Sequence, residues 1–358
     1  MSLPKTISLS ALLEKRSIAT SAPCRIELGG TWDVKGFALP YEWINPCTVN
    51  IAMNMRTHVI LSSHTPGKIK LIQSNESIEF DLYTPDLKGP FKLLCMIASY
   101  FGMDGYVANF AFESPVKSGL GGSGVVAIVF IAALQRARQL LNNTKHTFSK
   151  NEQVYLAHCF EESLNFSITG IQDQAAAMFG GVNYWEWHYS KPVKFTRKSI
   201  LEKHQYKELE KRLIIVYLGP HNSSDMNKKY VDSFFNSAER VKWFELNQKT
   251  KEFSQAITSQ NWEKIIKIMK YENNFRQQIA PERLIPVGHR LWKIAQKNAA
   301  GFSVCGAGAG GCIWTIAKTE EIKQIIEQEY AAAIGKENIL SSQIAFEGLK
   351  YTYEILSR

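Results

Sequence analysis

The sequence predicts an α+β protein built as two lobes. Its 358 residues suffice for about two domains of ordinary size, and 45% of them are hydrophobic, which is ample for two cores. Segments with the pattern of strands are followed by segments with the pattern of helices, and this order occurs once in each half of the chain. We expect the first lobe to cover residues 1–185 and the second to cover residues 186–358.

The expected strands of the first half are rich in β-branched residues. They cover 24–28, 48–62, 68–73, 77–82 and 105–112, with one helix at 90–101 between the last two. A helix of about 20 residues then begins at the glycine cluster near Gly121. A second helix is expected from Lys150 to Leu164, with Ser149 as its N-cap. The segment VNYWEW at 182–187 completes this half as a strand.

The second half opens with a lysine-rich stretch, 191–212, that contains few bulky apolar residues. We expect a solvated loop or helix face there, because a nucleic-acid-binding strip would interleave aromatic residues with the cations. The elements expected after it are a strand at 213–218, helices at 225–246, 262–276 and 287–299, strands at 302–304 and 312–317, and a helix at 320–333.

Charge and composition narrow the possible partners. A formal charge of +9 and a pI near 9.1 suit an anionic partner. The longest apolar stretch, Val125–Leu134, is about half as long as a membrane span. The six cysteines lack the spacing of a zinc finger or redox dithiol, and the N-terminus lacks the apolar core of a signal peptide. We therefore expect a cytoplasmic protein that binds neither membranes nor nucleic acids; the sequence leaves its oligomeric state open.

Two glycine clusters, GLGGSG at 119–124 and GAGAGG at 306–311, both fit the pattern G-x-G-x-x-G. A dinucleotide-binding fingerprint also needs a strand before it, a helix after it and an acidic residue about 20 positions later. No acidic residue follows Gly124 until Glu152, and the second cluster leads into an expected strand. Neither cluster fits a dinucleotide site, and the chain has no G-x-x-x-x-G-K-[ST] loop.

The first cluster instead combines a glycine loop with the start of a long helix. Unpaired N–H groups at a helix N-terminus attract anions, and glycines let the backbone approach a phosphate closely. Ser123 adds a hydroxyl that could bind a phosphate-bridging Mg²⁺. The same glycines would also suit a helix start packed tightly against its neighbours, and the loop alone does not decide between the two.

Four segments in order resemble the GHMP kinases, the family of galactokinase and of homoserine, mevalonate and phosphomevalonate kinases. They are APCRIELGGTWD at 22–33, PVKSGLGGSG at 115–124, GIQDQ at 170–174 and CGAGAGG at 305–311. The resemblance implies a two-lobed GHMP kinase fold, with an N-terminal lobe like ribosomal protein S5, a ferredoxin-like C-terminal lobe and the active site in the cleft. It also implies ATP as phosphoryl donor and Mg²⁺ as cofactor.

Carried over position by position, the resemblance implies that Asp173 is the catalytic base and that Arg25 lies near Asp173 and the γ-phosphate. Ser123 and Glu161 would bind Mg²⁺, and Asp33 would bind hydroxyls of the acceptor. The implied ATP-binding loop contains Pro115, Ser118, Gly119, Leu120, Gly121, Gly122, Ser123 and Gly124. The implied acceptor contacts also include Gly30 and Gly308.

These residue types suit phosphoryl transfer, which depends on positioning and on neutralising charge more than on covalent help. Mg²⁺ prefers a few hard oxygen ligands together with the phosphates of its substrate, which a serine and a glutamate allow. An aspartate is a weak base, yet it can accept the hydroxyl proton late in the reaction. Gly122 stands where the family has its first serine, which removes a hydroxyl but keeps the backbone N–H.

The segments RIELGGTWD, GIQDQ and FGGVN look most like the branch of D-glycero-D-manno-heptose 7-phosphate kinase and L-fucokinase. That branch implies an anomeric acceptor hydroxyl and a sugar 1-phosphate product, and the basic charge slightly favours an acceptor that already carries a phosphate. The alternatives are a catalytically silent ATP- and sugar-binding sensor, a decarboxylase of the same family, or a kinase for another small alcohol. A sensor would be expected to lack Asp173, Glu161 or Ser123, and all three are present.

Overall fold

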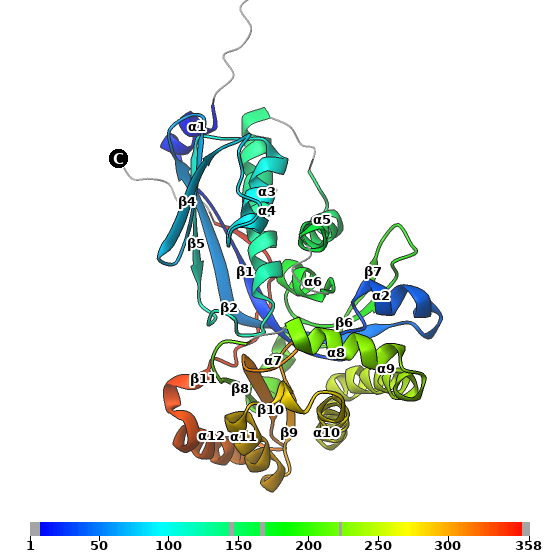
Figure 1. Ribbon diagram of the computed structural model, residues 1–358. Helices are drawn as coiled ribbons and strands as arrows, with labels where there is room; N and C mark the ends of the chain where they lie inside the picture. The colour runs from blue at the N-terminus through cyan, green and yellow to red at the C-terminus, as the bar shows by residue number, and fades with distance from the viewer. Residues whose placement is uncertain (1–7, 143–146, 165–168, 222–223, 353–358) are drawn as a thin grey trace, which may run out of the picture.

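The computed structural model describes residues 8–142, 147–164, 169–221 and 224–352. Figure 1 shows two lobes, one above the other, with ends of β1 and β2 at the joint between them. The chain enters the second lobe after β7 and returns to the first sheet with β12. The first lobe is a large sheet with helices packed on one face, and the second is a smaller sheet with its own helices. This arrangement confirms the expected α+β fold.

The first sheet has the strand order β12-β1-β2-β5-β3-β4, and β6 and β7 extend it from β2. All of its paired strands are antiparallel except β3 and β5. Its strands are β1 (Ile18–Leu28), β2 (Cys47–Ser63), β3 (Lys68–Gln73), β4 (Glu76–Asp81), β5 (Tyr106–Phe112), β6 (Val182–Trp187), β7 (Phe195–Ser199) and β12 (Lys350–Thr352). The helices of this lobe are α1 (Leu9–Lys15), α2 (Lys35–Ala38), α3 (Lys92–Phe101), α4 (Gly122–Asn142), α5 (Lys150–Ser163) and α6 (Gln172–Phe179).

The second sheet is antiparallel, with the order β11-β8-β10-β9. Its strands are β8 (Leu213–Tyr217), β9 (Gly301–Val304), β10 (Cys312–Ile316) and β11 (Ile339–Leu340). The helices of this half are α7 (Tyr206–Glu210), α8 (Ser224–Phe235), α9 (Ser237–Thr258), α10 (Trp262–Ile279), α11 (Pro286–Lys297) and α12 (Glu320–Ile334). As expected, the second glycine cluster joins two strands, β9 and β10.

Helix α4 is the central helix of the first lobe. Its apolar run Val125–Leu134 is buried against β1 and β2 and against α3, α5 and α6. Within the described part of the chain, it is also the one helix that is long and apolar enough to cross a membrane. Most of that apolar window is covered by the protein itself, as is usual for a core helix. The helix therefore serves here to fix the glycine loop at its N-terminus.

The two lobes share a core where β1 and β2 meet the second sheet. Ile26, Leu28 and Val49 pack in one buried cluster with Ile215 and Trp314. Burial of this apolar surface stabilises the contact between the lobes. The segments on either side of the joint, including both glycine clusters, are therefore held in a fixed relation.

Three local features differ from the expected elements. The single helix expected at 225–246 is two helices, because the Asn236 side chain accepts from the Ala238 N–H and caps a new helix there. The lysine-rich stretch contains a strand, β7, in which Phe195 alone is buried and the other residues are exposed. The expected lobe boundary after residue 185 falls inside β6, and the first sheet continues to Ser199.

Candidate active site

A cavity of about 630 Å³ lies at the joint between the lobes. Both glycine clusters reach it, and so do the residues that follow β1 and the start of α6. The residues expected at the site that line this cavity are Arg25, Gly30, Asp33, Pro115, Ser118, Gly119, Gly121, Gly122, Ser123, Glu161 and Asp173. The structure therefore brings together Arg25 and Asp173, which are 148 positions apart in the sequence, and Glu27 and Gly306, which are 279 apart.

The first glycine loop leads into α4, whose helical residues begin at Gly122. Gly119 has a φ of +75°, and a Cβ there would lie 2.7 Å from the Cys305 carbonyl oxygen, so this position requires glycine. Two residues of the expected ATP-binding loop do not line the cavity. Leu120 is buried in the core, and Gly124 packs against the Asp173 side chain and the start of α6. Leu120 and Gly124 therefore anchor the loop to the protein interior, on the side away from the cavity.

Asp173 and Arg25 form a direct ion pair in the cavity. Arg25 Nε and Nη2 lie 2.8 and 2.7 Å from Asp173 Oδ1, and Arg25 Nη1 donates to the Gly119 carbonyl oxygen at 2.6 Å. The Arg25 side chain is buried, whereas the Asp173 side chain is about a quarter exposed and faces the cavity. The start of α6 thus presents a carboxylate to a ligand, with its orientation fixed by the arginine.

Glu161 projects from α5 toward the start of α4. The Ser123 hydroxyl donates to its carboxyl group, and the Gln174 side chain donates to the same group. Burial raises the Glu161 pKa from 4.5 to about 7, and the nearby Asp173 adds to the shift. Across the described residues, no three Asp, Glu, His or Cys side chains form a metal site made of protein alone. A buried glutamate and a serine therefore fit Mg²⁺ only where phosphates supply further ligands.

Asp33 is buried beside the turn that precedes α6. Its carboxylate accepts from the backbone N–H and the side-chain amide of Gln172, both at 3.1 Å, and from the Thr31 N–H at 3.2 Å. Burial raises the Asp33 pKa to about 6, with a further contribution from the charge of Asp173. The turn that carries Asp173 and the loop that carries Asp33 are therefore fixed to each other.

The second glycine cluster reaches the cavity at its first positions only. Gly306 and Ala307 line the cavity, whereas Gly308 does not. A Cβ at Gly308 would lie 2.7 Å from the Arg283 carbonyl oxygen, on the side packed against the protein. Gly308 is therefore set back from the cavity wall against the backbone of the second lobe, and its contact with the acceptor stays a prediction.

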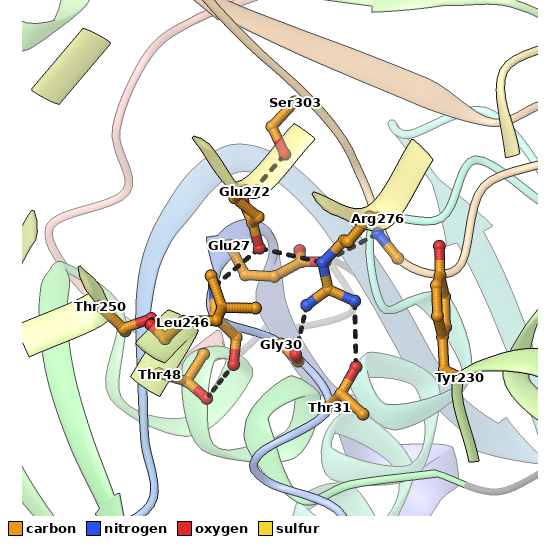
Figure 2. Close-up of polar contacts among 12 residues, drawn as sticks. Glu27, Gly30, Thr31, Thr48, Tyr230, Leu246, Thr250, Glu272, Arg276 and Ser303 are labelled. Atoms are coloured by element: carbon orange, nitrogen blue, oxygen red, sulfur yellow. Dashed lines mark hydrogen bonds and ion pairs between the residues drawn. The ribbon is translucent and has the colours of Figure 1, made fainter. Parts of the chain in front are cut away.

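The structure adds residues that the sequence patterns did not single out. Glu272 and Arg276 on α10 hold the loop after β1, as Figure 2 shows. Glu272 accepts from the Gly29 N–H and from Arg276 Nε, both at 3.1 Å, and Arg276 donates to the Gly30 carbonyl oxygen and the Thr31 hydroxyl. Only the spacing of four between Glu272 and Arg276 on one helix could have indicated this pair.

One part of the cavity lining, here called the apolar recess, consists of apolar side chains. Pro90, Leu93, Leu94, Phe112 and Val126 line it. These residues come from the segment leading into α3, from α3 itself, and from β5 and α4, all of which were expected as elements but not as parts of a site. A cavity lined both by this apolar recess and by a glycine loop suits a ligand with a flat apolar part and an anionic part.

We expect Glu161→Gln to stabilise the ligand-free protein at pH 8 but not at pH 4, below the ordinary glutamate pKa. Since the folded state raises the Glu161 pKa, the folded protein retains a proton that the unfolded chain releases, and stability falls as pH rises from 4.5 to about 7. A glutamine avoids this cost, on the order of 1–3 kcal/mol at pH 8. Thermal denaturation of both proteins at the two pH values measures the difference. An equal or lower melting temperature for the variant at pH 8 would contradict the assignment of a costly buried carboxylate.

Comparison with known proteins agrees with this geometry. Residues 91–181 match the family model described as the GHMP kinases N terminal domain. This segment runs from α3 to the end of α6 and contains the first glycine loop, Glu161 and Asp173. A comparison with curated proteins found no match.

Several solved structures share the fold over almost the whole chain. A D-glycero-D-manno-heptose 1-phosphate kinase from B. thetaiotaomicron is 16% identical, with 95% of this chain and 100% of that chain covered and a TM-score of 0.69. A Lactococcus lactis galactokinase complexed with galactose is 17% identical, with 96% and 99% covered and a TM-score of 0.69. A Streptococcus pneumoniae phosphomevalonate kinase in complex with phosphomevalonate and AMPPNP is 13% identical, with 94% and 100% covered and a TM-score of 0.70. The chain therefore contains a match to the GHMP kinases N terminal domain over residues 91–181, and its two-lobed fold is similar to those of these solved structures.

Proposed function

We propose that this protein is an ATP-dependent sugar kinase that transfers the γ-phosphoryl group of ATP to a sugar hydroxyl. The observation that carries the proposal is the pairing of Asp173 and Arg25 next to the glycine loop at the N-terminus of α4, in one cavity with Glu161 and Asp33. This arrangement provides a proton acceptor, a cation and an anion-binding loop within reach of one another.

The glycine loop is suited to the phosphates of ATP. The first N–H groups of α4 have no partner within the helix, and together they attract an anion. Gly121, Gly122 and Ser123 line the cavity at this end. The apolar recess around Leu93 and Phe112 lies on the side of the first lobe and would receive the adenine ring.

Magnesium would be held by Ser123 and Glu161 together with the phosphates, where it would neutralise negative charge. Glu161 binds a cation as the carboxylate, so cation binding and loss of its proton are linked. Its raised pKa therefore makes the site sensitive to pH near neutrality.

The acceptor would lie between Asp173 and Asp33. The Asp173 carboxylate accepts the hydroxyl proton as the hydroxyl oxygen bonds to phosphorus, and Arg25 offsets charge on the transferred group. Asp33, fixed by Gln172 and Thr31, has a carboxylate that can accept from further hydroxyls of the sugar. These contacts orient the acceptor, which is the main requirement of phosphoryl transfer.

The substrate is proposed to be a heptose 7-phosphate or a fucose-like sugar, phosphorylated at its anomeric hydroxyl. The supporting features are the RIELGGTWD and GIQDQ segments around Asp33 and Asp173. The similarity in fold to a heptose phosphate kinase and to a galactokinase agrees with a sugar acceptor.

Release of ADP from Mg·ATP, measured against a panel of acceptors, tests the proposal. The panel contains L-fucose, galactose, arabinose, mannose, heptose and heptose 7-phosphate. We expect turnover on one of them, well above the rate of ATP hydrolysis without sugar. Binding of ATP without turnover of any acceptor would favour the alternative of a catalytically silent ATP- and sugar-binding sensor. Absence of ATP binding would contradict the proposed site altogether.

We expect Gly170→Ala to weaken use of the acceptor. An added Cβ at this position would lie 1.7 Å from Asp33 Oδ2, so the carboxylate must leave its contacts with Gln172. The expected loss in kcat/KM for the sugar is roughly 10-fold or more, the effect of losing one hydrogen bond to a charged group. Steady-state kinetics with varied sugar measures it.

The matched control is Gly36→Ala on α2, where nothing lies within 4 Å of an added Cβ. This control is expected to keep kcat/KM for the sugar. Normal kcat/KM in Gly170→Ala would contradict the placement of Asp33 in the acceptor site.

A further inference from the structure

One ion pair on β1 connects the glycine loops of the two lobes. Arg25 and Glu27 are two positions apart, so their side chains leave the strand on the same face. Arg25 Nη1 donates to the Gly119 carbonyl oxygen at 2.6 Å, and Glu27 Oε1 accepts from the Gly306 N–H at 2.7 Å. Arg25 Nη1 and Glu27 Oε2 lie 2.9 Å apart. Each residue of the pair therefore holds one of the two loops.

The catalytic arginine lies between two carboxylates. Asp173 contacts the Nε and Nη2 atoms of Arg25, and Glu27 contacts its Nη1 atom. Contacts on both sides of the guanidinium group fix its rotation as well as its position. Without Glu27, the arginine would keep Asp173 and Gly119 as partners but lose the carboxylate on the other side.

Glu27 occupies a costly position for a carboxylate. It is buried, and burial raises its pKa from 4.5 to about 7. The charged or titratable groups near it are Arg25, Asp173, Glu272, Arg283 and Cys305. A buried carboxylate lowers stability unless its partners compensate, so its presence in the cavity wall indicates a positioning role.

We propose that Glu27 is a positioning residue for phosphoryl transfer, which holds Arg25 against Asp173 and fixes the Gly306–Ala307 wall of the cavity. Glu27 acts through these groups and does not take the proton of the acceptor. This inference rests on the proposed kinase function, because its kinetic effect is expressed through Arg25. It also makes a structural claim, the link from β1 to the second glycine loop, that can be measured without turnover.

Glu27→Gln tests the kinetic claim. The glutamine amide has one acceptor oxygen and one donor nitrogen, so it can keep the contact with Arg25 or the contact with Gly306 but not both. We expect kcat to fall roughly 10- to 100-fold, the usual effect of misplacing a reacting group by about 1 Å. The KM values for ATP and sugar should change by less than about threefold. The reason is that contacts which bind the ground state and the transition state equally are retained.

Glu272→Gln is the matched control, since Glu272 is also buried between the lobes and paired with an arginine, Arg276. It holds the Gly29–Thr31 loop and makes no contact with Arg25. We expect this variant to raise the KM for the sugar more than it lowers kcat. If both variants gave the same pattern, or if Glu27→Gln kept its kcat, Glu27 would be an ordinary structural residue and the proposal would be wrong.

Hydrogen exchange tests the structural claim independently of activity. In Glu27→Ala, the Gly306 N–H loses its acceptor, and exchange in a peptide covering residues 305–311 should become faster than in the wild type. Glu272→Gln should leave that peptide unchanged. Unchanged exchange in Glu27→Ala would overturn the link between the lobes. A different outcome would refute the kinase proposal alone. In it, the wild type turns over no acceptor, yet the peptide still exchanges faster in Glu27→Ala than in the wild type.

Discussion

Asp173→Asn is expected to lower kcat by roughly 10²- to 10⁴-fold, the usual contribution of a general base. The asparagine has nearly the same size and can still accept from Arg25, but it cannot take the hydroxyl proton. The glycine loop and the apolar recess around Leu93 do not depend on this carboxylate. The dissociation constant for ATP should therefore change by only a few-fold, and calorimetry can measure it beside the kinetics.

The control for this variant is Asp104→Asn. The Asp104 carboxylate accepts from the Gly67 N–H at 2.9 Å on the exposed side of the first lobe, outside the cavity. It should keep full activity. A kcat for Asp173→Asn within about tenfold of the wild type would show that no general base of ordinary strength acts at this position.

Glu161→Gln is expected to lower kcat by roughly 10²-fold or more, because a metal contributes several kcal/mol to charge stabilisation in such reactions. The glutamine removes the carboxylate that interacts with Ser123, and Mg²⁺ should therefore bind more weakly. A titration of activity with Mg²⁺ should show half-saturation at a higher concentration. The same variant is expected to be more stable than the wild type at pH 8, so the loss of activity would not be due to unfolding.

The neighbouring residue provides the matched control, Glu162→Gln. Its side chain is about 38% exposed, and its partner is His158 rather than Ser123. The Mg²⁺ dependence of this control should match that of the wild type. An unchanged Mg²⁺ dependence in Glu161→Gln would contradict the assignment of Glu161 as a metal ligand.

Local sequence signals predicted the elements that position the site. The start of α4 at the glycine cluster and the cap of α5 at Ser149 each follow from a few adjacent residues. The pairing of Arg25 with Asp173, implied by the resemblance, is present in the structure at hydrogen-bonding distance. The two helix starts could be predicted because each depends on a short motif, whereas the Arg25–Asp173 pair was implied only by the resemblance.

The remaining features depend on contacts between distant parts of the chain. Glu272 lies more than 240 positions from the Gly29 N–H that it accepts from, and nothing in the spacing of either residue indicates that contact. Leu120 and Gly308 belong to motifs whose neighbours line the cavity, yet their own positions face the protein interior. The break at Asn236 was missed because the apolar pattern continues through it while the cap interrupts the backbone.

The most direct test of the account is ³¹P NMR of the reaction between Mg·ATP and the acceptor found in the panel. The account predicts a new sugar phosphate resonance that grows in step with ADP in the wild type and is lost in Asp173→Asn. Equal sugar phosphate formation by wild type and Asp173→Asn would contradict the proposed catalytic site. Conversion of ATP to ADP and inorganic phosphate, with no sugar phosphate formed, would contradict the central claim that this cavity transfers a phosphoryl group to a sugar.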